Sequence, residues 1–119
     1  MTQGWESELK RYSVVFSKGA EIDLVEIVNY YESRNRKFAL ELYQTVKARV
    51  LELSTTPERG REVPELEHQG IQGVRELIEG NYRIVYSISD GRVAVHTIVD
   101  SRRNLEELLM KKLQLEQKG

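Results

Sequence analysis

Two side chains in the C-terminal half of the sequence, Arg83 and His96, are of types that can bind an anion and transfer a proton. The planar guanidinium of arginine stays charged and matches the geometry of phosphate, so Arg83 could bind a phosphate or carboxylate group. The imidazole of His96 could take up a proton as a general base. A single histidine in a strand is more often structural, and both interpretations stay open at this point. The chemistry depends on whether the fold brings the two side chains to one face.

The stretch 73–104 predicts three antiparallel strands joined by two tight turns. From Tyr82 to Ile88 the apolar residues occupy every second position, which is the period of a half-buried strand. Asp90-Gly91 is a strong signal for a hairpin, because a type I′ turn needs two residues that tolerate positive φ.

A two-residue turn at Asp90-Gly91 fixes the register and places Ile84 opposite Thr97. The predicted core face comprises Tyr82, Ile84, Tyr86, Ile88, Val93, Val95 and Val99. The predicted second face is mixed and comprises Arg83, Val85, Ser87, Ala94, His96 and Ile98. In this register Arg83 shares a face with His96 and points away from the core.

Arg75 lies on the strand before Tyr82, and the turn between these strands decides which face it occupies. A two-residue turn places Arg75 on the core face opposite Tyr86, whereas a three-residue turn moves it to the face of Arg83. We predict the second register, because it avoids an unpaired arginine in the core. A salt bridge from Arg75 to Glu26 or Glu41 is the structural alternative.

The N-terminal half predicts a strand followed by two helices. We expect residues 1–11 to form a flexible tail and residues 12–16 to form a short strand. Ser17 is the predicted N-cap of the first helix, and the second helix spans about Lys37 to Ser54. The apolar stripes comprise Ala20, Leu24, Ile27, Val28 and Tyr31 on the first helix, and Phe38, Leu42, Val46, Val50 and Leu53 on the second. The short break between them predicts a helical hairpin that covers the apolar face of the sheet.

Residues 55–72 predict a long connection, which is either functional or a surface loop packed by Val63 and Leu66. Asn104 is the predicted N-cap of a C-terminal helix over residues 105–117, with Glu107 as its capping-box partner. The apolar stripe of this helix comprises Leu105, Leu108, Leu109 and Leu113. The predicted fold is α+β over a single domain, residues 1–119. It has a four-stranded antiparallel sheet packed against an N-terminal helical hairpin, in the order β-α-α-β-β-β-α.

Composition narrows the classes of function. The 119 residues carry 18 basic and 19 acidic side chains, a net charge of −1, which argues against a broad nucleic-acid footprint. The absence of cysteine excludes disulfides and thiolate metal sites, and fits the cytoplasm. No apolar run predicts a membrane span, so we expect no membrane partner. No glycine-rich phosphate loop or zinc-ligand spacing occurs, so we expect neither a cofactor nor a metal.

The order of elements and several local motifs resemble the RelE/ParE toxin family of bacterial type II toxin–antitoxin modules. The matching residues are Ala20, Asp23-Leu24, Ile27 and Tyr31, Pro57 and Gly60, Val74-Arg75-Glu76-Leu77, Tyr82-Arg83-Ile84-Val85-Tyr86, Asp90, and Arg102-Arg103. The resemblance covers residues 12–104, and its most specific part is the three-stranded meander. It implies a toxin that stabilises a plasmid or other replicon and is neutralised by a cognate antitoxin.

In the ribonuclease branch of that family, toxins cut messenger RNA on the ribosome. The resemblance implies that Arg83 and Arg103, with its neighbour Arg102, would hold the phosphate, and His96 could act as the base. The lysines common in RNA-cutting relatives are absent, since the corresponding positions are Val74 and Glu76. The stretch 104–110 also lacks the terminal tyrosine or histidine.

The ParE branch resembles this sequence better, and its members inhibit DNA gyrase by binding it. That resemblance implies a target-binding surface with Arg75, Arg83, Arg102 and Arg103 as anchors. We therefore predict a non-enzymatic inhibitor, with ribosome-dependent endoribonuclease activity as the alternative. Both hypotheses require Arg83 and Arg103 to be exposed, so that exchanging either affects toxicity more than stability.

Overall fold

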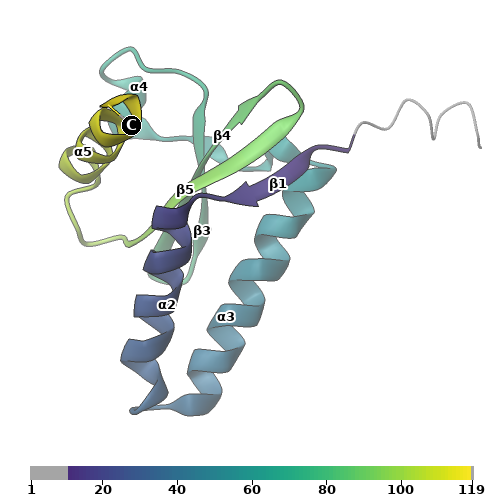
Figure 1. Ribbon diagram of the computed structural model, residues 1–119, viewed down its shortest axis with the longest axis vertical. Coiled ribbons are helices and arrows are strands. Elements are labelled where there is room, and N and C mark those ends of the chain that lie inside the picture. Colours follow the sequence, from purple (N-terminus) through teal and green to yellow (C-terminus); the bar gives the residue numbers. More distant parts are fainter. Residues whose placement is uncertain (1–10, 119) are drawn as a thin grey trace, which may run out of the picture.

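A computed structural model describes residues 11–118, with side chains described as far as Lys111. The chain forms one central sheet with helices on each of its two faces (Figure 1). The elements are β1 (Ser13–Phe16), α2 (Lys18–Glu32), α3 (Arg36–Leu51), η1 (Glu52–Ser54), η2 (Pro57–Arg59), β2 (Arg61–Glu62), α4 (Pro64–Glu67), β3 (Val74–Glu79), β4 (Tyr82–Ser89), β5 (Arg92–Asp100) and α5 (Leu105–Lys118). The predicted N-terminal tail lies outside the described residues except for Arg11, as does the side chain of Leu113.

The sheet is mixed and has five strands in the order β1-β5-β4-β3-β2, so the prediction of four antiparallel strands is wrong in number and direction. The α+β class, the helical hairpin and the antiparallel meander β3-β4-β5 are confirmed. β1 runs parallel to β5, with Val14 opposite Val93. Periodicity identifies a strand without giving its direction, which here depends on contacts remote in sequence. The additional strand, β2, is only two residues long and comes from the predicted connection.

The turn between β4 and β5 follows the prediction, and the register beyond it does not. Asp90 and Gly91 have φ values of 47° and 75°, as a type I′ turn requires. A β-bulge then shifts the register between Val85 and Tyr86, so that Tyr86 pairs with Val95 and Val85 with Thr97. His96 is the extra residue between these pairs.

The bulge exchanges the faces of the residues that follow it. Ile84 lies opposite Ile98 rather than opposite Thr97. Ile98 therefore joins the core beneath the helical hairpin, and Val99 packs on the other face of the sheet with Val85. The prediction reversed the faces of Ile98 and Val99, because an inserted residue moves every later side chain to the opposite face.

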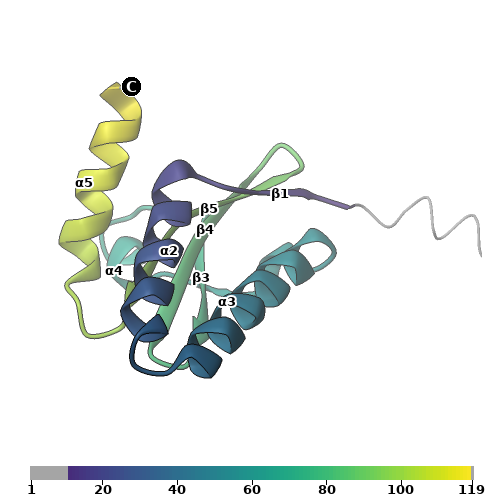
Figure 2. The ribbon, with the colours of Figure 1, turned by 60° about the horizontal axis from the view of Figure 1, so that its bottom comes forward.

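The helical hairpin packs on one face of the sheet (Figure 2). α2 begins where predicted, because the Ser17 hydroxyl accepts a hydrogen bond from Ala20 N at 3.0 Å. α3 ends at Leu51, three residues before the predicted end, and continues as the 3-10 turn η1. The buried core residues comprise Ala20, Leu24, Leu42, Val46, Val50, Leu53, Leu77, Ile84, Tyr86, Val93, Val95 and Ile98. Phe38, predicted on the apolar stripe, is 41% exposed because it lies in the first turn of α3, beside the connection between α2 and α3.

A second, smaller core covers the other face of the sheet under α4 and α5 (Figure 1). Its buried members are Val63, Leu66, Val85, Val99, Leu105 and Leu109. Val63 and Leu66 thus pack as the surface-loop alternative for this connection expected. Asn104 caps α5 as predicted, accepting a hydrogen bond from Glu107 N at 3.1 Å. Among the described residues, no helix is both long and apolar enough to cross a membrane.

Tyr86 fixes the connection that leads from α3 to these elements. Its hydroxyl donates to Pro57 O at 2.6 Å and accepts from Gly60 N at 2.9 Å. Gly60 is needed there, because a Cβ atom would lie 2.4 Å from Glu76 O. The segment is therefore held against the sheet by a buried side chain, which positions β2 and α4.

Candidate functional site

The bend between β5 and α5 presents two of the predicted site residues, Arg102 and Arg103, to solvent. Ser101 N donates to Asn81 O at 2.8 Å, and Arg103 N donates to Asp100 O at 3.0 Å. These bonds fix the backbone of the bend against the turn before β4. The arginines therefore lie at a defined position of the surface.

Arg102 forms a forked ion pair with Asp100, two residues before it. Its Nε and Nη2 atoms lie 2.9 and 2.6 Å from the two carboxylate oxygens. This hydrogen bonding lowers the pKa of Asp100 to about 2. The Arg102 side chain is 83% exposed, and Arg103 forms no ion pair within the described residues. Both guanidinium groups remain within reach of a partner.

A pocket of about 530 Å³ opens between this bend and α2. Three tyrosines line it, namely Tyr30, Tyr31 and Tyr82. Tyr82 Oη donates to Tyr31 Oη at 3.3 Å, so the two hydroxyl groups fix each other. Burial, with the bond to Tyr31, raises the pKa of Tyr82, which stays neutral and keeps its hydrogen-bonding proton.

The pocket carries both signs of charge. Asp23, Glu26 and Asp100 face it together with the two arginines. Asp23 also accepts hydrogen bonds from Thr97 Oγ1 at 2.6 Å and Ile98 N at 3.2 Å, which ties α2 to β5. No histidine, lysine or cysteine is among the described lining residues. The pocket therefore offers charges of both signs and tyrosine hydroxyl groups to a polar partner.

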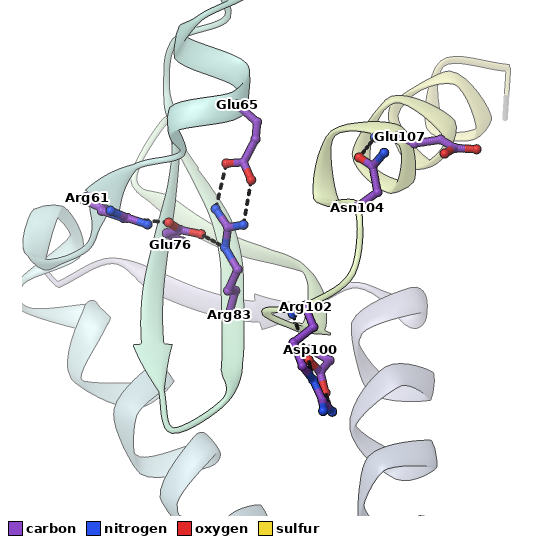
Figure 3. A network of polar contacts seen from close by, with 8 residues as sticks. All are labelled: Arg61, Glu65, Glu76, Arg83, Asp100, Arg102, Asn104 and Glu107. Carbon is purple, nitrogen blue, oxygen red and sulfur yellow. Dashed lines mark hydrogen bonds and ion pairs between the residues drawn. The ribbon is translucent and has the colours of Figure 1, made fainter.

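Arg83 lies elsewhere, in a buried ion network (Figure 3). Its Nε donates to Glu76 at 2.6 Å, and its two Nη atoms donate to Glu65 at 2.7 and 2.8 Å. Arg61 Nε donates to the second oxygen of Glu76 at 2.7 Å. The network therefore joins β2, β3, β4 and α4.

The expected exposure of Arg83 is wrong, since the residue is 8% exposed. It does point away from the helical hairpin, but α4 covers it and supplies Glu65. Glu76 on β3 is 1% exposed, because β2 extends the sheet beyond β3. The hydrogen bonds from Arg83 lower the pKa of Glu65. The sequence offers no local signal for the pairing of Arg83 with Glu65, because eighteen positions separate them.

Arg75 occupies the register that was not predicted. The Gly80-Asn81 turn has two residues, so Arg75 pairs with Tyr86. Its Nη1 donates to Gly60 O at 2.6 Å, and its Nη2 lies 4.0 Å from Glu58 rather than near Glu26 or Glu41. Because the guanidinium donates to the Gly60 carbonyl, this register does not leave Arg75 as an unpaired charge, which was the reason for predicting the other register.

His96 lies apart from the arginines of the bend, at the bulge in β5. Its Nε2 atom is 2.7 Å from the hydroxyl of Ser87, and its carbonyl accepts a hydrogen bond from Ser17 at 3.2 Å. Of the predicted site residues, the structure thus places only Arg102 and Arg103 at one pocket. The sequence predicted these two arginines as a pair, but it did not predict the three tyrosines beside them. The tyrosines could not be assigned, because Tyr31 appeared only as a core residue of a helix.

Within residues 11–111, no group of three or more His, Cys, Asp or Glu side chains is arranged to hold a metal ion. The carboxylates of the network at Arg83 are instead neutralised by arginines.

Comparisons with known proteins identify the family from a sequence model and the fold from solved structures. The family model described as ParE toxin of type II toxin–antitoxin system, parDE, matches residues 14–105. The fold is similar to a structure of the chromosomal ParDE system from P. aeruginosa, with a TM-score of 0.63, 20% identity, and coverage of 76% of this chain and 97% of that chain. It is also similar to the RelBE2 toxin–antitoxin complex from Mycobacterium tuberculosis, with a TM-score of 0.55, 22% identity, and coverage of 76% and 98%. No curated protein sequence matches the chain. At these identities the two structures establish the fold alone.

Proposed function

Because the chain belongs to the ParE toxin family of type II toxin–antitoxin systems, we propose that it inhibits growth by binding DNA gyrase or another replication target. Its action would lie in the cytoplasm, where those targets are. The proposed contact residues are Arg102 and Arg103 with the tyrosine-lined pocket beside them. Such a module would stabilise the plasmid or chromosomal segment that carries it.

The different environments of the arginines carry this proposal. Phosphodiester cleavage needs a cation free to bind the pentavalent phosphate. Arg83 is instead bonded to Glu65 through both Nη atoms and to Glu76 through Nε. Arg102 and Arg103 are exposed on an ordered bend, which suits recognition of a protein surface, where arginine is a frequent anchor.

We further propose that a cognate antitoxin neutralises the toxin. Both solved relatives are toxin–antitoxin systems or complexes by their titles. Antitoxin segments that fold on binding can cover a large toxin surface. The proposal predicts that a short acidic antitoxin is encoded beside this chain and that its co-expression restores growth.

The test combines induced expression in a bacterial host with two molecular readouts. The expected result is growth arrest with blocked supercoiling by purified gyrase and intact messenger RNA. The double variant Arg102→Ala/Arg103→Ala should lose growth inhibition and keep its circular dichroism spectrum. Arg92→Ala, an exposed arginine at the β4–β5 turn, is the matched control and should stay toxic.

Two results would overturn the proposal. New messenger RNA ends clustered within codons would identify a ribosome-dependent endoribonuclease, and His96 beside Ser87 would then be the first residue to exchange. Full toxicity of the double variant would exclude the bend as the contact site.

A further inference from the structure

The turn between α2 and α3 carries a dense cluster of cations. Arg34, Arg36 and Lys37 fall within four residues, and all are exposed. No acidic residue interrupts them, and the first turn of α3 contains none. The end of the hairpin is therefore basic, although the whole chain has a net charge of −1.

Local stability does not explain two of these cations. Arg36 and Lys37 are the first two residues of α3. The N-terminus of a helix carries partial positive charge, so cations there are unfavourable. No ion pair offsets this cost among the described residues. Because these cations do not stabilise the helix, binding of a partner explains their presence better than local stability does.

Two aromatic rings lie exposed beside the cations. Tyr30 is 55% exposed and Phe38 is 41% exposed. Both contact the half-buried ring of Tyr31 edge-to-face, with centroid distances of 5.0 and 4.8 Å. Tyr31 therefore holds the two rings in fixed positions. Aromatic and arginine side chains together dominate the energetics of protein interfaces.

Arg34 is ordered before any partner arrives. Its guanidinium carbon lies 4.1 Å from the centroid of the Tyr30 ring, and its Nη1 atom donates to Tyr30 O at 2.7 Å. The residue is nevertheless exposed at the end of α2. Because less side-chain entropy is lost when such a group binds, its contacts contribute more to affinity.

The hairpin end is continuous with the pocket at the bend. Tyr30 belongs to both, and Tyr31, which contacts Tyr30 and Phe38, lines the pocket together with Arg103. The pocket itself contains carboxylates, including Glu26. A nucleic acid carries negative charge at every phosphate and would meet these carboxylates unfavourably. A polypeptide can place acidic side chains on the cations and an apolar or basic side chain in the pocket.

We propose that the hairpin end, formed by Tyr30, Arg34, Arg36, Lys37 and Phe38, is a docking surface for an acidic polypeptide segment of the toxin's target. The proposal rests on the proposed function and names the chemistry of the partner at the same site. Acidic side chains of the segment bind the three cations, and an aromatic or aliphatic side chain packs on Tyr30 and Phe38.

The decisive variant is Arg36→Glu/Lys37→Glu, which reverses two exposed charges. The matched control is Arg11→Glu/Arg92→Glu, which reverses two exposed charges beside the start of β1 and the β4–β5 turn, away from the α2–α3 turn (Figure 1). Growth inhibition is measured for each variant at equal expression. Binding is measured by fluorescence anisotropy, using a labelled twelve-residue peptide of alternating Glu and Leu and a labelled oligothymidine of equal length.

The hairpin variant should require at least about tenfold more protein for the same growth inhibition, and its peptide binding should weaken at least about tenfold, as expected for lost charge complementarity. The control variant should match the wild type in both. Equal toxicity of the hairpin variant and the wild type would overturn the proposal and leave the proposed function intact. Preference for oligothymidine over the peptide would also overturn it, in favour of a nucleic-acid surface. If the wild type does not inhibit growth, the proposed function fails, while the peptide measurement still decides whether this surface binds acidic polypeptide.

Discussion

Arg83 and Arg102 form the same kind of contact in opposite environments (Figure 3). Each guanidinium is forked onto one carboxylate, Arg83 onto Glu65 at 2.7 and 2.8 Å and Arg102 onto Asp100 at 2.9 and 2.6 Å. The Arg83 side chain is 9% exposed and that of Arg102 is 83% exposed. A buried charge that loses its partner is costly, whereas an exposed pair is largely compensated by water. The geometry of the pair therefore does not reveal its energetic role.

The two pairs also differ in what they connect. Arg83 joins α4 to β4 and, through Glu76 and Arg61, to β3 and β2. Arg102 bonds to Asp100, two positions before it, so this pair joins no separate elements. The first pair acts as a crosslink within the fold, and the second shapes a turn while leaving its arginine at the surface.

The largest effect on stability should come from removing the buried arginine of the two pairs. Arg83→Ala would leave Glu76 buried beside Arg61 alone and would release Glu65. We expect a loss of about 3–5 kcal/mol in the free energy of unfolding, as for other buried pairs that lose one partner. Urea denaturation followed by circular dichroism measures it.

Arg102→Ala is the control for that measurement, and its urea midpoint should stay at the wild-type value. Equal midpoints for Arg83→Ala and the wild type would mean that the buried network contributes nothing to stability. The distinction between the two arginines would then fail.

The parts of the fold that depend on neighbouring residues could be predicted from the sequence. The caps at Ser17 and Asn104 and the Asp90-Gly91 turn are local, so residue types within a few positions determine them. The toxin family was likewise predictable, because the meander carries its motifs over contiguous residues.

The features of the fold that the sequence did not predict depend on contacts between distant segments. The direction of β1 is set by β5, about eighty positions later, and the bulge at His96 has no composition signal of its own. The burial of Arg83 required knowing that Glu65 returns over the sheet from the predicted connection. For the candidate site, Arg102 and Arg103 were predictable as a pair after a strand, whereas the tyrosines beside them come from two other elements.

A smaller effect should appear as pH dependence at the buried network. Arg83 lowers the pKa of Glu65 below its ordinary value of 4.5. A carboxyl with a lowered pKa in the folded state contributes stability that is present above the ordinary pKa and is lost as pH falls through the lowered one. The free energy of unfolding should therefore fall below about pH 4.5 in the wild type, and less steeply in Glu65→Gln. Glu67→Gln, an exposed position on the same helix, should keep the wild-type slope. Identical slopes for all three proteins would remove Glu65 from the network's pH dependence.

The smallest effect tests the exposed pair through salt. Hydrogen bonds from Arg102 hold the pKa of Asp100 at about 2, below its ordinary 3.8. Because the Debye length shortens from about 10 Å at 0.1 M salt to about 3 Å at 1 M, exposed charges attract each other less at high salt. The pKa of Asp100, followed by NMR of its carboxyl carbon, should rise toward its ordinary value in 1 M salt, and Arg102→Ala should raise it at low salt. The pKa of Glu65 in the same titration should move less, because its partner Arg83 is shielded from solvent. Equal salt shifts for both carboxyl groups would mean that water reaches the two pairs alike, and the contrast between a buried crosslink and an exposed, available arginine would have no electrostatic basis.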